Sequence, residues 1–416
     1  MKKVKIIVIG AGMRGAGYSE YAKKFPEELE VVGVAEPRDW HRNDFKKQYN
    51  IPEANCYKTW QEVVEAEKFA DAVMICTDDK MHFEPAMAFA NKRYHILLEK
   101  PMSPDEDECR QITQAAIDND LICSFCHVLR YTAYTQELKR LLDAGTIGDI
   151  ASVQHLEPVG YWHMAHSFVR GNWRNTDESS FILLAKSCHD LDWLSYIIDK
   201  SCKQVVSFGS LKHFRPEEKP EGAADRCLDC RKEATCPYSA KKVYYRFFNE
   251  GKRNYPLDIL TPEVDDDSLY KALEEGPYGR CVYSCDNDVC DNQTVMMQFE
   301  DNITCNFTLS AFTPVEDRRT TIFGTRGQIK GDGKMLEIYD FVTEKTTKID
   351  TSLIDNSSLA GHGGGDGGLI KNFVDAIAKN DASLVLSGAE ASLRSHLIAF
   401  AGERSRLNKS IEDIRE

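Results

Sequence analysis

The chain has 416 residues, of which 42% are hydrophobic and 28% are charged, and its net charge at pH 7 is −14. This length and composition suit a globular protein of two domains, each with a sizeable core. The acidic excess argues against nucleic acid as a partner, because such binding depends on neutralising phosphates with basic side chains.

Neither secretion nor membrane insertion is expected. Lys5 interrupts the short apolar run at residues 4–9, and glycines and Arg14 follow it in place of a small-residue cleavage site. No segment reaches the roughly 20 apolar residues of a membrane helix. We therefore expect a cytoplasmic protein with no membrane partner, whose 14 cysteines are reduced thiols or metal ligands.

The first part of the chain alternates between short apolar runs and helical patterns. We predict strands at residues 4–9, 30–36, 72–76, 95–99 and 121–125, and helices at residues 13–24, 39–48 and in the segment that ends at residue 89. This alternation predicts an α/β domain of the Rossmann type, with a parallel, doubly wound sheet, over residues 1–128.

The pattern then changes to longer strands. A helix is predicted at residues 134–144, strands at 151–156, 204–210, 293–300, 302–310 and 318–324, and helices at 369–379 and 388–408. Residues 303–309 alternate between apolar and polar, which is typical of a half-buried antiparallel strand. We predict an α+β domain over residues 129–416, dominated by one antiparallel sheet and carrying a Cys-rich insertion at about 213–288.

A glycine-rich turn joins the first strand to the first helix. Such a turn lets the backbone approach a pyrophosphate, and the helix N-terminus offers free N–H groups to the phosphates. The residues expected to hold a dinucleotide here are Gly10, Gly12, Met13, Arg14 and Gly15.

The choice of dinucleotide depends on the end of the second predicted strand. Glu36 lies about 21 residues after Gly15, where an acidic residue binds the adenosine ribose hydroxyls. Its carboxylate favours NAD over NADP, because it would repel a 2′-phosphate. Arg38 could neutralise that phosphate, so NADP remains an alternative.

Two further segments follow strands at the same predicted edge of the sheet. Thr77, Asp78 and His82 follow the third strand, where ligands bind in such folds, although capping or local packing explains them equally well. Glu99 and Lys100 end the fourth strand. Lys100 could bond the cofactor ribose and a substrate hydroxyl together and transfer a proton; the alternative is an ordinary solvated lysine.

These motifs together resemble the Gfo/Idh/MocA family, the glucose–fructose oxidoreductase and inositol dehydrogenase group. The resemblance covers nearly the whole chain and continues through Arg130-Tyr131, residues 145–150 and His189-Asp190-Leu191-Asp192. It implies a Rossmann domain followed by a domain with a large, open, predominantly antiparallel sheet. It also implies a small-molecule sugar or polyol substrate between the domains, and a dimer or tetramer formed by pairing of the open sheets.

One position departs from the resemblance. The family pairs its lysine with an Asp-x-x-x-His helix; His189 matches the histidine, but Ala185 stands at the aspartate position. His189 is therefore the candidate base or acid. Lys186 lies one turn earlier and could orient the substrate, or it could form a structural ion pair.

Three residues are candidates for substrate contact. The resemblance brings the segment with Trp173 and Arg174 close to the nicotinamide and substrate, although packing and surface pairing are equally compatible with both side chains. His362 lies in a glycine-rich segment, residues 361–368, where it and Asp366 could close over the substrate; the alternative is a flexible linker.

The insertion carries a cluster of cysteines. A Cys-x-x-Cys pair with two further thiols fits a structural zinc site, which would order an insertion with little apolar core of its own. The predicted ligands are Cys227, Cys230, Cys236 and Cys281, with Cys285 as the alternative fourth ligand. Free thiols, a redox pair and an iron–sulfur cluster remain alternatives.

The sequence thus predicts an NAD(P)-dependent oxidoreductase. It would transfer hydride between nicotinamide and a secondary hydroxyl or ketone of a sugar, polyol or sugar derivative. One alternative is redox-neutral glycoside cleavage through a transient keto sugar with tightly held NAD. Another is a regulator that senses a nucleotide or sugar without catalysis.

Overall fold

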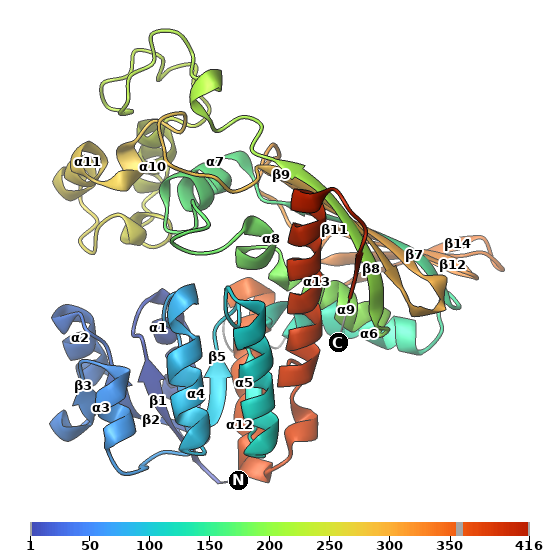
Figure 1. Cartoon of the computed structure of the whole chain (residues 1–416), viewed down its shortest axis with the longest axis horizontal. Coiled ribbons are helices and arrows are strands. Elements are labelled where there is room, and N and C mark those ends of the chain that lie inside the picture. The colour runs from blue at the N-terminus through green and yellow to red at the C-terminus, as the bar shows by residue number, and fades with distance from the viewer. Residues whose placement is uncertain (1, 355–360, 415–416) are drawn as a thin grey trace.

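The computed structural model describes residues 2–354 and 361–414, which form two sheets with their covering helices. The first sheet and its helices occupy the lower left of Figure 1, and the second sheet extends to the right. The long helix α13 (Ala389–Asn408) runs between them. Within the described residues, no helix is long and apolar enough to span a membrane.

The first sheet is parallel throughout, with the strand order β3-β2-β1-β4-β5-β6. Its strands are β1 (Val4–Ile9), β2 (Leu29–Ala35), β3 (Cys56–Tyr57), β4 (Ala72–Ile75), β5 (His95–Leu98) and β6 (Cys123–Phe125). All four residues of β4 are buried, because helices cover both faces. Near-continuous apolar runs are typical of such strands, and the predicted Rossmann architecture is confirmed.

Two sets of helices cover this sheet. The helices α3 (Trp60–Glu65), α4 (Phe83–Asn91) and α5 (Glu106–Asp118) contribute to the apolar cluster on one face. On the other face lie α1 (Met13–Lys24), α2 (Asp39–Tyr49) and α12 (Gly365–Lys379). The helix α12 comes from the far end of the chain, yet it shares an apolar cluster with β1.

The N-terminus of α12 differs from the prediction. The glycine-rich segment was expected to end before a helix at Leu369, but residues from Gly365 onward are already helical. A Cβ atom on Gly365 would lie 2.4 Å from the backbone oxygen of Val128, and one on Gly368 would lie 2.9 Å from that of Tyr131. These glycines therefore permit close packing of α12, which outweighs their low helix propensity.

The second sheet has nine strands in the order β14-β13-β12-β11-β7-β10-β9-β8-β15. Every neighbouring pair is antiparallel except β7 and β10, which are parallel. The strands are β7 (Ile150–Pro158), β8 (Cys202–Ser210), β9 (Asn292–Phe299), β10 (Thr304–Ser310), β11 (Arg319–Gly324), β12 (Gly327–Gly331), β13 (Met335–Asp340), β14 (Lys345–Asp350) and β15 (Glu412–Asp413). The predominantly antiparallel second sheet is confirmed.

In the described part of the chain, helices cover one face of the second sheet. The helices α6 (Ala133–Asp143), α9 (Cys188–Ile198) and α13 contribute side chains to the same apolar cluster as β7 and β10. Along β10 the residues alternate between exposed and buried at its start, as the sequence predicted. Phe208 and Met296 are exposed on neighbouring strands, so the other face carries large apolar side chains.

The Cys-rich insertion contains α10 (Ala240–Asn249) and α11 (Asp266–Glu275). It forms the upper left part of Figure 1, beside α7 (Tyr161–Met164) and above α8 (Ile182–Ala185). Contrary to the prediction, it has an apolar core of its own, built from Cys227, Ala240, Val243, Tyr244, Phe247, Leu257, Leu269 and Leu273. Six of these side chains come from the two helices, whose apolar spacing the sequence analysis did not recognise, and Cys227 and Leu257 come from the segments around them.

Candidate active site

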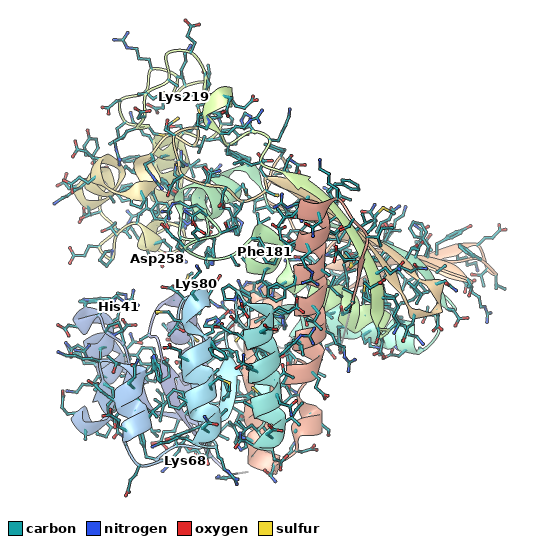
Figure 2. All side chains as sticks on the ribbon, in the orientation of Figure 1. His41, Lys68, Lys80, Phe181, Lys219 and Asp258 are labelled. Carbon is teal, nitrogen blue, oxygen red and sulfur yellow. The ribbon has the colours of Figure 1, made fainter. Side chains whose placement is uncertain are left out.

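The predicted site residues follow strands that end at one edge of the parallel sheet. Gly10 follows β1, Glu36 follows β2, Thr77 lies just beyond β4, and Lys100 lies just beyond β5. This edge faces the second domain: in Figure 2, Lys80 lies at the top of the first domain, below Phe181 and Asp258. Ligands bind at such edges in doubly wound sheets.

The glycine-rich turn fits a dinucleotide. A Cβ atom on Gly10 would lie 2.6 Å from the Cys76 oxygen, and one on Gly15 would lie 2.2 Å from the Gly10 oxygen, so packing requires glycine at both positions. Gly12 instead borders open space, with only an Arg38 side-chain nitrogen 3.5 Å away. In the described structure no side chain caps the N-terminus of α1, which leaves its N–H groups free for a phosphate.

Glu36, which the sequence predicts to bind the ribose, has a buried and hydrogen-bonded side chain. The side chain is 1% exposed, and it accepts hydrogen bonds from the Ala11 backbone N–H at 2.9 Å and from Arg38 Nε at 2.7 Å. Burial alone would raise the pKa of Glu36, but these donors lower it below its ordinary value. The carboxylate is therefore ionised, with Arg38 as its partner.

Arg14 lies in the first turn of α1 and links three segments. Its Nε atom donates to Glu99 at 2.9 Å, and its Nη2 atom donates to Asp366 of α12 at 3.0 Å. Glu99 also accepts from the Tyr18 hydroxyl and from the Lys100 backbone N–H. Although burial would raise the pKa of Glu99, the positive charges of Arg14 and Lys100 lower it. Arg14 thus organises the loops at this edge.

The residues after β4 mainly make structural hydrogen bonds to backbone oxygens. His82 is fully buried, and its Nδ1 and Nε2 atoms lie 2.7 Å and 3.0 Å from the backbone oxygens of Pro101 and Thr77. The Thr77 hydroxyl donates to the Met81 oxygen. Asp78 is exposed. His82 therefore connects the β4 and β5 loops, which corresponds to the packing alternative for this residue.

Lys100 reaches across from the first domain to the second. Its Nζ atom donates to the backbone oxygen of Ala185 at 3.0 Å and lies 5.6 Å from the centre of the Trp173 ring. Ala185 is the position where the resemblance led us to expect an aspartate. The contact with Lys100 is kept, but a backbone carbonyl makes it in place of a side chain.

His189 lies in the first turn of α9, close to Lys100. Its ring is 9% exposed, and its Nδ1 atom has no hydrogen-bond partner among the described residues. Burial, together with the positive charge of Lys100 and the neighbouring ring of His127, lowers the pKa of His189 well below its ordinary value. His189 is therefore a neutral imidazole at neutral pH, which is able to accept a proton.

Lys186 belongs to an ion-pair network beside His189. Its Nζ atom lies 3.1 Å from Glu157, and Arg318 lies 2.9 Å from Glu157 and 2.5 Å from Asp190. The structural ion pair considered for Lys186 is thus present. The network places Lys186 within the second domain, next to the first turn of α9.

The predicted substrate residues separate into two groups. Trp173 lies beside Lys100, and the ring centre of His362 lies 6.2 Å from that of His189. Arg174 instead pairs with Glu178 and Asp286, and these contacts hold its guanidinium away from the Lys100 group. Surface pairing is the structural alternative that applies to Arg174.

The zinc prediction is not supported. The four predicted ligands line one cavity of about 30 Å³, but among the described residues no group of three or more His, Cys, Asp or Glu side chains is arranged to hold a metal ion. An Arg170 nitrogen lies 3.5 Å from the Cys227 sulfur. Burial raises the pKa of Cys236 and of Cys281.

Two buried residues at the site were not among the predicted site residues. Asp79 accepts hydrogen bonds from the Ser179 hydroxyl at 2.8 Å and from the Trp173 indole at 3.5 Å, so it fixes the ring beside Lys100. His127 is fully buried, with its ring centre 6.2 Å from that of His189. Asp79 directly follows the predicted Asp78, and its contacts with Ser179 and Trp173, about 100 residues away, are not visible in the sequence.

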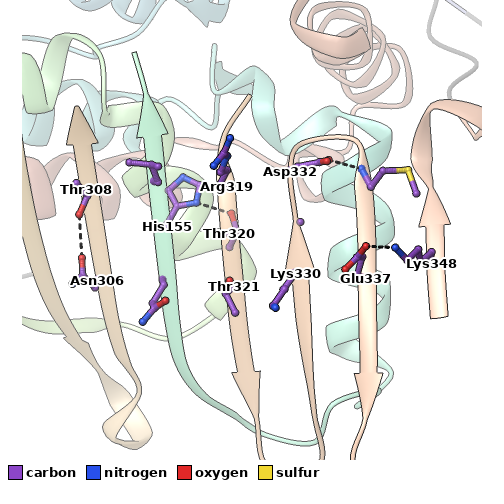
Figure 3. Close-up of a pocket in the computed structure, with 14 residues that line it drawn as sticks. His155, Asn306, Thr308, Arg319, Thr320, Thr321, Lys330, Asp332, Glu337 and Lys348 are labelled. Atoms are coloured by element: carbon purple, nitrogen blue, oxygen red, sulfur yellow. Dashed lines mark hydrogen bonds and ion pairs between the residues drawn. The ribbon is translucent and has the colours of Figure 1, made fainter. Parts of the chain in front are cut away.

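A separate cavity of about 720 Å³ lies over strands β7 and β10–β13 of the second sheet (Figure 3). Most of the residues that line it are of polar or charged types, among them Thr308, Arg319, Lys330 and Glu337. None of the residues predicted to bind cofactor or substrate lines it. The cavity is therefore distinct from the candidate active site. It is also larger than the cavity beside the cysteines.

Comparison with known families agrees with this geometry. Residues 4–127 match the oxidoreductase family with an NAD-binding Rossmann fold, and residues 139–410 match the C-terminal α/β domain of the same family. The chain belongs to the Gfo/Idh/MocA oxidoreductase family. It is thus an oxidoreductase whose first domain has the NAD-binding Rossmann fold of this family.

Individual relatives are distant. The putative oxidoreductase YteT of Bacillus subtilis strain 168 is 22% identical over an alignment of 437 positions, which covers 98% of each chain. Myo-inositol 2-dehydrogenase of Thermotoga maritima is 24% identical over 210 residues, covering 50% of this chain and 59% of that protein. The solved structure of levoglucosan dehydrogenase with NADH and levoglucosan covers 100% of both chains at 16% identity and a TM-score of 0.72, which shows a shared fold.

Proposed function

We propose that this enzyme is an NAD-dependent dehydrogenase that oxidises a secondary hydroxyl of a sugar, polyol or sugar derivative, and that reduces the ketone in the reverse direction. The observation that carries the proposal is Lys100, held at the ligand edge of the Rossmann sheet by Ala185 and lying beside the neutral imidazole of His189. A cationic donor beside a neutral acceptor suits proton transfer from an alcohol.

Different residues of the first domain would bind the pyrophosphate and the ribose of the dinucleotide. The turn at Gly10 and Gly12 and the N-terminus of α1 would hold the pyrophosphate, and Glu36 would accept hydrogen bonds from the ribose hydroxyls. The buried carboxylate of Glu36 favours NAD over NADP, because a 2′-phosphate would be repelled. When bound, the nicotinamide supplies the acceptor for the hydride.

Lys100 and His189 would contact the substrate. Lys100 orients the hydroxyl through its ammonium group, which Trp173 and the Ala185 carbonyl hold in place. His189 accepts the hydroxyl proton, since burial keeps its ring neutral. Asp79 positions Trp173 through its hydrogen bond to the indole, so the first domain sets the position of a second-domain ring.

Substitution of Lys100 tests the proposal. Wild-type protein would be supplied with NAD and, in turn, myo-inositol, scyllo-inositol and levoglucosan, and NADH would be followed by its absorbance. With a substrate that the wild type oxidises, Lys100→Ala is expected to lower kcat/KM by about 10²–10⁴-fold, the range for loss of a group that assists proton transfer. The exposed Lys371→Ala is the matched control. Near wild-type turnover by Lys100→Ala would refute the assigned role.

The same assay separates the two alternatives. A dehydrogenase accumulates NADH in proportion to the ketone formed. A redox-neutral glycosidase would release a sugar from a glycoside without net NADH, and a sensor would bind NAD and sugar with neither product. The homo-oligomeric assembly and the cytoplasmic location stay predictions.

A further inference from the structure

A histidine–aspartate pair lies next to the buried imidazole of His189. The Nδ1 atom of His362 is 2.9 Å from Oδ1 of Asp366. Although burial would raise the pKa of Asp366, the hydrogen bond from His362 and the charge of Arg14 lower it, so the carboxylate is ionised and can only accept. Nδ1 therefore carries the hydrogen in this contact, which leaves Nε2 as the ring nitrogen that can exchange a proton with other groups.

The backbone holds His362 in an unusual conformation. Its φ angle is +46°, in the left-handed region, and Gly363 and Gly364 follow with φ angles of +60° and +88°. A residue other than glycine in this region is strained by about 1 kcal/mol or more and persists only where other contacts fix it. Asp366 provides such contacts, because it bonds both His362 and Arg14. Such strain is typical of functional sites.

The pair lies between His189 and solvent. The ring centres of His362 and His189 are 6.2 Å apart, a separation that one water molecule can bridge. The side chain of His362 is 44% exposed, whereas His189 is 9% exposed. On the opposite side, His127 is fully buried. Among these three rings, within the residues that the structure describes, that of His362 is the most exposed.

The cationic neighbours of His189 offer no comparable route for a proton. Lys186 and Arg318 are both paired with Glu157, and Lys100 is bound to the Ala185 carbonyl. A proton accepted by buried His189 must leave before the next turnover, and desolvation makes its retention unfavourable. His362 is the titratable ring next to it that reaches solvent.

We propose that His362, oriented by Asp366, receives the proton that His189 takes from the substrate and transfers it to water. This step rests on the proposed dehydrogenase function. The O–H proton passes to His189 as the C=O bond forms, and a nicotinamide dinucleotide held at the turn of Gly10 and Gly12 would supply the acceptor for the C–H hydrogen and its electron pair. The proton then moves from His189 to His362 Nε2 and on to solvent, which returns His189 to its neutral form. Asp366 and His362 thus form a carboxylate–imidazole pair beside His189, where Ala185 has no carboxylate to offer.

The first test is kinetic and uses the full-length enzyme with the polyol that the wild type oxidises. His362→Ala is expected to lower kcat by about 10²-fold with little change in KM, and added imidazole should restore the rate in a concentration-dependent manner. Lys371→Ala, on the exposed side of α12, should behave as the wild type. An unchanged kcat in His362→Ala, or a loss that imidazole does not restore, would overturn the proposal.

The second test needs no turnover. In the ¹⁵N NMR spectrum of the free protein at a pH where the ring is neutral, His362 should be found as the Nδ1–H tautomer, and Asp366→Asn should redistribute it between tautomers. The same tautomer mixture in both proteins would overturn the assigned role of Asp366. If the wild type forms no NADH with any polyol, the proposed function fails and this step with it. NADH formation at equal rates by wild type and His362→Ala refutes this step alone.

Discussion

A pair of glycine substitutions in α1 measures how tightly the dinucleotide turn is packed. A Cβ atom on Gly15 would lie 2.2 Å from the Gly10 backbone oxygen and 3.1 Å from the Val8 side chain. The first distance is well below the 3.0 Å that Cβ atoms keep from other atoms. A Cβ atom on Gly17, in the same helix, would meet no described atom within 4 Å. Gly17→Ala is therefore a matched control for Gly15→Ala.

The magnitude follows from the contacts. Both substitutions gain the helix propensity of alanine, about 0.5–1 kcal/mol, so Gly17→Ala should be slightly more stable than the wild type. Only Gly15→Ala must move the backbone, which costs about 1–3 kcal/mol or more. The difference between the variants is thus about 1–3 kcal/mol, equivalent to roughly 3–10 °C in the unfolding temperature of a domain of this size.

Two measurements check this expectation. Differential scanning calorimetry should place the first-domain transition of Gly15→Ala below that of Gly17→Ala. Fluorescence titration with NADH should show weaker binding by Gly15→Ala alone, because displacement of α1 moves its N-terminus away from the phosphate. Equal unfolding temperatures and equal NADH affinity in the two variants would refute the packing argument for Gly15.

Three further predictions concern charge. Arg130 forms a buried bidentate pair with Asp192 at 2.7 Å, so Arg130→Met should lower the free energy of unfolding by about 3–5 kcal/mol in urea titrations, and the double variant with Asp192→Leu should recover part of the loss. Burial lowers the pKa of His396 to about 3, whereas its pKa in the unfolded chain is about 6.5. The stability that the neutral ring contributes is therefore present above pH 6.5 and is lost as the pH falls toward 3. His396→Asn should reduce the slope of the unfolding free energy against pH in that window by up to about 1.4 kcal/mol per pH unit. Glu36→Ser should shift the ratio of kcat/KM for NAD over NADP toward NADP by about tenfold or more, and an unchanged ratio would contradict the ribose assignment.

Local patterns in the sequence were sufficient for most strands of the first domain. Apolar runs of four to six residues alternating with helical periods predicted β1, β2, β4 and β5, because buried parallel strands and amphipathic helices each leave a clear period. The turn at Gly10 and the lysine after β5 could be placed for the same reason. Short or mainly polar elements were missed, including β3, β12, β13 and β14, since exposed β14 carries no apolar period.

The tertiary structure decided which of the candidate residues meet. Lys100 and Ala185 are 85 residues apart, and Arg14 and Asp366 are 352 apart, so only the packing of the two domains and of α12 brings them together. Sequence could name His362, but not its contact with Asp366 or its distance from His189. The same packing pairs Arg174 with Glu178 and Asp286 and brings Arg170 to within 3.5 Å of the Cys227 sulfur, which local sequence patterns do not show. Residue types and local periods determine the elements and their chemistry, whereas long-range burial determines charge state, partners and access to solvent.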